Sequence, residues 1–137
     1  MSHLNVTPFL RKVLLADAVV SGAAGLVMLA GGAALQALLQ LPGWLMLGGG
    51  ATLVAYAAFL GWLSRRASVP RGLVWALVVL NVGWALDCAL IAFGGWLQPS
   101  GLGQAFLGVQ IAAVLVFAEL QFIALQRGRA PGAQVHA

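Results

Sequence analysis

Three acidic side chains are the residues of this chain best suited to chemistry, because each falls within a long apolar stretch. Asp17 lies in the first such stretch, Asp87 in the third and Glu119 in the fourth. The loops between the stretches carry no carboxylate. A carboxylate within a membrane-spanning segment is costly to bury and typically marks an ion or proton path, or a contact with a partner. Any chemistry is therefore expected to centre on these three acids.

Asp17 and Glu119 are expected at similar depth. Asp17 follows Arg11 by six residues, and Glu119 precedes Arg127 by eight. At a rise of about 1.5 Å per residue, these separations correspond to about 9 and 12 Å along a helix. Ion pairs with inward-bent arginines near one membrane surface are the structural alternative to a functional role. We predict that both acids face the bundle interior or an adjoining subunit, and that at least one lies near an arginine.

Asp87 differs because no cation is expected near it. It follows Arg71 by sixteen residues, about 24 Å along a helix, and the loops on that side carry no charge. Asn81, Trp84 and Cys88 share a broad helical face with it. The Trp84 indole and the Asn81 amide can donate hydrogen bonds. We predict that Asp87 is interior and close to Trp84, either as a proton or cation site or as a neutral residue that holds helices together.

Further polar side chains are expected to line the same interior. Gln110 and Gln121 are eleven residues apart and share a helical face, whereas Glu119 points nearly the opposite way. Gln110 lies near the middle of its stretch and needs a partner across a helix interface. Thr52 and Tyr56 are four residues apart and can both present hydroxyl groups.

The composition indicates that the surroundings of this chain are a membrane. Of its 137 residues, 62% are hydrophobic and 7% are charged, whereas a soluble domain has roughly 25% charged residues. Its apolar stretches reach the ~20 residues that a spanning helix needs. We predict an all-α bundle of four transmembrane helices in a single domain over residues 1–130, with a disordered tail at 131–137. The predicted spans are about 9–30, 44–63, 71–94 and 102–125.

Proline positions support these boundaries. All five prolines lie at or outside the ends of the predicted spans, and a proline inside a helix would cost about 3 kcal/mol. Residues 1–8 are expected to form a short tail, in which Asn5 or Thr7 can cap the first helix. Residues 33–42 are expected to form a short interfacial helix or the frayed end of the first span.

The charges predict an orientation. All lysines and arginines fall on one side of a bundle with four spans, so the positive-inside rule places both termini in the cytoplasm. The expected location is a bacterial inner membrane, and the expected partners of the cations are anionic lipid headgroups rather than nucleic acid. The cations are Arg11, Lys12, Arg65, Arg66, Arg71, Arg127 and Arg129.

Small residues in the first span predict close helix packing. Ser21 and Gly25 are four residues apart, as are Ala18 and Gly22, and such spacing lets helix backbones approach each other in lipid. We expect Ser21, Gly22 and Gly25 to be packing positions, either within the bundle or at the face of a homo-oligomer.

No metal or cofactor site is expected within the spans. The only histidines, His3 and His136, lie near the termini, which removes the usual ligands of an intramembrane haem or zinc ion. Cys88 is the single cysteine and is expected to be a small packing residue. A membrane enzyme or a quinone-binding redox subunit is disfavoured, because no histidine lies in a span and no nucleophile–base pair is visible.

Two functions fit these residues. The first is a small transporter or channel subunit for protons or small cationic solutes, in which the acids and Asn81 line a polar path. The alternative is a non-catalytic membrane subunit or assembly factor whose acids pair with cations of another membrane protein or of a second copy. A hydrated path that joins Asp87 to Glu119 favours the first function. A dry interior with either of these acids facing lipid favours the second.

Overall fold

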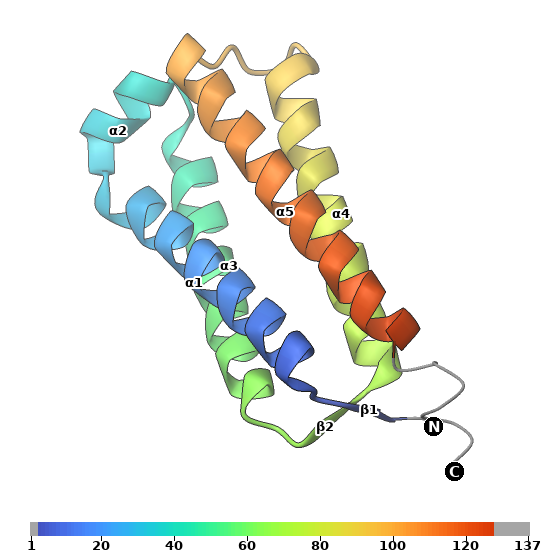
Figure 1. Ribbon diagram of the computed structural model, residues 1–137. Coiled ribbons are helices and arrows are strands. Elements are labelled where there is room, and N and C mark those ends of the chain that lie inside the picture. The colour runs from blue at the N-terminus through green and yellow to red at the C-terminus, as the bar shows by residue number, and fades with distance from the viewer. Residues whose placement is uncertain (1–2, 128–137) are drawn as a thin grey trace.

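The computed structural model describes residues 3–127, which form five helices and a short two-stranded ribbon (Figure 1). Four of these helices are long and apolar enough to cross a membrane, so the prediction of a helical chain with four such helices is confirmed. The predicted tail at 131–137 lies outside the described residues. The long helices are α1 (Pro8–Ala30), α3 (Gly43–Ser64), α4 (Arg71–Phe93) and α5 (Gly101–Arg127).

The helix ends follow from local chemistry, and each lies within two residues of the expected boundary. Thr7 caps α1, where its Oγ1 accepts a hydrogen bond from the Leu10 N–H at 3.2 Å. Pro8 occupies the first turn, where no amide hydrogen is needed. Pro42 and Pro70 have extended backbones directly before α3 and α4. The prolines therefore separate the helices, as the sequence predicts.

A separate short helix, α2 (Gly32–Leu39), connects α1 to α3. Gly32 and Gln40 at its two ends have φ angles of 59° and 54°, which let the chain turn sharply. α2 lies against the start of α5, where the Ser100 N–H donates to the Leu39 carbonyl at 3.0 Å. Gly103 packs directly on this carbonyl, since an added Cβ would collide with it.

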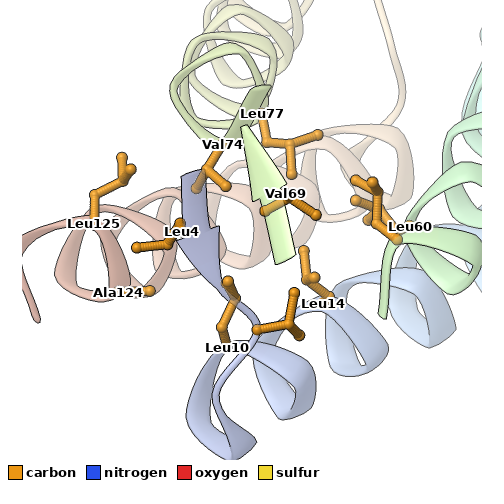
Figure 2. Close-up of a cluster of buried hydrophobic side chains, with 11 residues drawn as sticks. Leu4, Leu10, Leu14, Leu60, Val69, Val74, Leu77, Ala124 and Leu125 are labelled. Carbon is orange, nitrogen blue, oxygen red and sulfur yellow. The ribbon is translucent and has the colours of Figure 1, made fainter. Parts of the chain in front are cut away.

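Residues 3–5 form a strand rather than part of a tail, which the sequence did not predict. β1 (His3–Asn5) pairs antiparallel with β2 (Ser68–Pro70), and Leu4 lies opposite Val69. A three-residue strand is too short to show an alternating pattern. Its stability comes from burial, because Leu4 and Val69 join an apolar cluster with residues of all four long helices (Figure 2).

The long helices are arranged as two pairs. α1 packs along α3 and α4 along α5, and the pairs meet mainly through α1 and α5 (Figure 1). Gly25 and Gly50 allow α1 and α3 to approach closely, because a Cβ built on Gly25 would lie 2.7 Å from the Gly50 carbonyl oxygen. A Cβ on Gly22 would lie 3.3 Å from the Ala57 Cβ. The small residues of α1 thus pack within this chain.

Several arginines bind carbonyl oxygens at one end of the bundle. The Arg11 Nε donates to the Ser64 carbonyl at 2.7 Å, and an Arg71 guanidinium nitrogen donates to the Leu125 carbonyl at 3.2 Å. The Arg127 guanidinium carbon lies 4.3 Å from the centre of the Phe9 ring. Cations near helix C-termini complement the helix dipole. This end of the bundle, which carries the β ribbon, therefore gathers the positive charge.

Candidate functional site

Asp17 is the acid that the fold buries. Its side chain is 0% exposed, and it lies near the middle of α1 on the face that meets the other helices. Ser21 lies one turn further along this face, and its Oγ donates to Asp17 Oδ1 at 2.9 Å. The spacing of four residues brings the two side chains together on one helix. Ser21 is therefore a partner of Asp17 as well as a small residue at a packed position.

The other three long helices each donate one hydrogen bond to Asp17 Oδ2. Tyr56 Oη of α3 lies at 3.0 Å, Asn81 Nδ2 of α4 at 3.3 Å and Gln121 Nε2 of α5 at 2.8 Å. Asn81 Nδ2 also donates to Gln121 Oε1 at 3.0 Å. We refer to these four residues, together with Ser21, as the Asp17 centre. It joins the two helix pairs through one carboxylate.

All four donors of the Asp17 centre are neutral, so within residues 3–127 Asp17 is not the acid that pairs with an arginine. Arg11 is the nearest arginine along α1, and its side chain donates instead to the carbonyl oxygens of Ser64 and Arg66. An ionised carboxylate accepts about four hydrogen bonds through its two oxygens. The four neutral donors therefore match its capacity without a counter-ion.

Trp84 and Gln110 form a second polar contact, between α4 and α5. The Trp84 Nε1–H donates to Gln110 Oε1 at 2.7 Å. Gln110 is buried, and Trp84 is half-buried. The sequence correctly expects a partner for Gln110 across a helix interface, but it assigns Trp84 to Asp87 instead. The indole N–H is thus already engaged in the bundle.

The prediction that Asp87 lies in the interior is wrong, because its side chain is exposed. The face of α4 that packs on its neighbours passes through Asn81, Ala85 and Cys88 at spacings of four and three residues. Asp87 lies about 100° from Cys88 around the helix, just outside this face. Cys88 is buried next to Ala92 and Leu107.

Glu119 is also exposed, so of the two positions expected for it, the interior of this bundle is wrong, and contact with an adjoining subunit stays a prediction. The buried face of α5 includes Gln110, Val114 and Gln121, and Glu119 points away from it. This agrees with the expectation that Glu119 and the glutamines have opposite directions. Of the acids, Asp17 alone joins a polar cluster in the described part of the chain.

Tyr56 and Gln121 are direct partners of Asp17, although the sequence suggests them only as accessory polar residues. The feature that could have identified them is their position, because each is a polar side chain within an apolar helix and is buried or half-buried. Thr52 shares a face with Tyr56, but its hydroxyl donates to the Gly48 carbonyl of its own helix at 2.8 Å. The spacing of Thr52 and Tyr56 along the helix does not show which of their two hydroxyl groups binds Asp17.

Two cavities lie between the helix pairs, and Trp84 belongs to the lining of both. One, of about 110 Å³, is lined by Ser21, Tyr56 and Asn81 of the Asp17 centre, together with Thr52, Trp84 and apolar residues. The other, of about 120 Å³, is lined by Trp84, Gln110, Asp87 and apolar residues. Trp84 therefore lines both the cavity beside partners of Asp17 and the cavity beside Asp87.

Fold and site together define the class of this protein as a small bundle with four potential membrane-spanning helices around a buried carboxylate. Comparisons with protein-family models, curated proteins and solved structures gave no match to this chain. Its function is therefore argued from the geometry of the site.

Proposed function

We propose that this chain is an integral membrane protein that acts as a transporter or channel subunit for protons or small cationic solutes. One observation carries this proposal: a fully buried carboxylate at the junction of the two helix pairs is held, within residues 3–127, by neutral donors alone. A charged side chain in a spanning segment is rarely tolerated without a function. Asp17 is the group that would bind the proton or the cation.

The partners of Asp17 suit a group that changes charge. The hydroxyl groups of Ser21 and Tyr56 can rotate from donating to accepting a hydrogen bond. The amide side chains of Asn81 and Gln121 carry an oxygen beside the donating nitrogen. When Asp17 binds a proton or a cation, these groups can turn their oxygens toward it. The Asp17 centre can therefore supply suitable hydrogen-bonding groups both when Asp17 is empty and when it holds a proton or a cation.

The location of Asp17 couples its state to the arrangement of the helices. Ser21 and Tyr56 belong to the α1–α3 pair, whereas Asn81 and Gln121 belong to the α4–α5 pair. Loading of Asp17 weakens or redirects the bonds that cross between the pairs. A ligand shifts a conformational equilibrium by its difference in affinity for the two states. Movement of one pair against the other is thus the expected response to binding.

Reconstituted protein tests this proposal. Purified full-length protein is placed in liposomes that enclose a pH-sensitive dye, and the decay of an imposed proton or cation gradient is followed. We expect Asp17→Asn to abolish the flux, because the neutral amide neither takes up a proton nor balances a cation. Glu119→Gln is the matched control, since it removes an exposed acid outside the Asp17 centre. Equal flux through wild type and Asp17→Asn would refute the proposal.

A second candidate function has an observation of its own. Asp87 and Glu119 are exposed on the sides of helices that are long enough to span a membrane. A carboxylate that faces lipid is unfavourable, and a cation of another protein relieves the cost. The chain would then be a membrane subunit whose acids pair with a partner. Native mass spectrometry of detergent extracts tests this: Asp87→Asn together with Glu119→Gln should release a bound partner that wild type retains.

A further inference from the structure

The cavity beside Asp87 has a lining that favours an organic ligand. It measures about 120 Å³, lies at the end of the bundle that carries α2, and is formed by residues of α1, α3, α4 and α5. Apart from Trp84, Asp87 and Gln110, its lining consists of leucine, isoleucine, methionine, phenylalanine and glycine residues. An apolar cavity of roughly 150 Å³ holds benzene. This cavity therefore suits an apolar group of about that size or slightly smaller.

One polar group at this cavity is left for a ligand. The Gln110 Oε1 accepts the Trp84 Nε1–H at 2.7 Å, so these two groups satisfy each other. Asp87 is exposed and, among residues 3–127, accepts no side-chain hydrogen bond. The cavity thus combines apolar walls, the indole ring of Trp84 and a single carboxylate to which no side chain of the described residues donates.

We propose that this cavity binds an organic cation, with its apolar group inside and its ammonium group beside Asp87. The carboxylate supplies the charge complement, and the Trp84 ring supplies a face that attracts ammonium groups. A metal cation does not fit, because hard cations require several oxygen ligands and the lining offers one free carboxylate. This inference goes beyond the proposed function, because it places an organic cation beside Asp87 rather than at Asp17.

Benzyltrimethylammonium is the probe that tests the site. Its phenyl ring matches the cavity volume, and tetramethylammonium carries the same charge without the ring. Equilibrium dialysis of full-length protein in nanodiscs measures the binding of both. We expect benzyltrimethylammonium to bind more tightly than tetramethylammonium. Asp87→Asn should weaken the binding of both by about tenfold or more, because the charge pair is lost. Glu119→Gln, which removes an acid away from the cavity, should leave both affinities unchanged.

A second variant locates the ligand independently of charge. Leu45 lines the cavity and is half-buried, so Leu45→Trp fills the space. This change should remove the preference for benzyltrimethylammonium over tetramethylammonium. The indole N–H resonance of Trp84, assigned with Trp84→Phe, should shift on addition of benzyltrimethylammonium to wild type. Retained preference in Leu45→Trp, or equal affinity in wild type and Asp87→Asn, would overturn the inference.

The experiment also separates this inference from the proposed function and from other occupants. Binding is measured without a gradient, so a cation that binds near Asp87 while flux is independent of Asp17 would reject transport and keep the site. Flux that depends on Asp17, without binding of either cation, would reject the site alone. If wild type binds no cation and Asp87→Asn changes the oligomeric mass, a protein partner covers the cavity, and the inference is wrong.

Discussion

At the scale of single residues, the same type of side chain has two different environments in this protein. Asp17 is buried and accepts four hydrogen bonds, whereas Asp87 and Glu119 are exposed. A buried charge is tolerated only when hydrogen bonds or a counter-charge replace the lost water. Side chains from four helices meet that requirement at Asp17. The structural role of this residue therefore depends on all four long helices at once.

Tyr56→Phe tests the contribution of one donor to the Asp17 centre. The change deletes the hydroxyl that lies 3.0 Å from Asp17 Oδ2 and leaves the ring in place. We expect the free energy of unfolding to fall by about 0.5–2 kcal/mol, the range for interhelical hydrogen bonds in membranes. This change in the free energy of unfolding is measured by unfolding the protein in mixed micelles with increasing SDS. Thr52→Val is the control, since it deletes a hydroxyl that binds its own helix. Equal losses in both variants would contradict the prediction.

The contact between Trp84 and Gln110 predicts non-additive effects. Gln110→Leu leaves the indole N–H without an acceptor, and Trp84→Phe leaves the Gln110 oxygen without a donor. Each single change should cost about 1–3 kcal/mol, because a buried polar group loses its partner. The double variant should be more stable than the sum of the single losses predicts. The same SDS titration gives this double-mutant cycle. Strict additivity would mean that the bond contributes nothing to stability.

At the scale of elements, the sequence predicts the helices well and the side-chain directions less well. Helix ends depend on local signals, such as Thr7 as a cap and Pro70 before α4, and these can be read from the chain alone. The direction of Asp87 depends on which face of α4 meets α5, which is a property of the packed bundle. Asp87 lies one residue from buried Cys88. A small rotation of α4 about its axis therefore decides whether Asp87 is buried or exposed.

The Asp17 centre was only partly predictable for the same reason. Mid-helix polar residues identify Asp17, Asn81 and Gln110 as candidates, but spacing within one helix does not show which residues of other helices they meet. Gln121 and Tyr56 reach Asp17 across 104 and 39 positions of sequence. The ribbon of β1 and β2 was missed because two segments of three residues carry no detectable periodicity.

Gly25→Ala tests the close approach of α1 and α3. Its new Cβ would lie 2.7 Å from the Gly50 carbonyl oxygen, and backbone atoms cannot move aside without separating the helices. We expect a loss of about 1–3 kcal/mol, as for overpacking in a dense core. Gly48→Ala is the matched control, because an added Cβ there meets open space. It should leave stability unchanged or raise it by up to about 1 kcal/mol. A Gly25→Ala variant as stable as Gly48→Ala would refute this packing.

At the scale of the whole molecule, one end of the bundle differs chemically from the other. The end with the β ribbon carries Arg11, Arg71 and Arg127 in contacts with carbonyl groups or a ring. The opposite end, formed by α2 and residues 94–100, has no charged residue. The cavity beside Asp87 lies toward this uncharged end, and the Asp17 centre lies nearer the middle of the helices. The two proposed sites are thus arranged along the length of the bundle.

The asymmetry of charge predicts how the protein is oriented in a membrane. In a Cys88→Ala background, single cysteines at the exposed positions Ala67 and Gln98 report on the two ends. By the positive-inside rule, a membrane-impermeant maleimide added to intact cells should label position 98 and not position 67. Replacement of Arg65 and Arg66 by glutamine, with lysines added near position 98, should produce a mixture of orientations. The matched change of both arginines to lysine should preserve the original labelling. Labelling of position 67 alone in intact cells would reverse the orientation and with it the side from which a cation reaches Asp87.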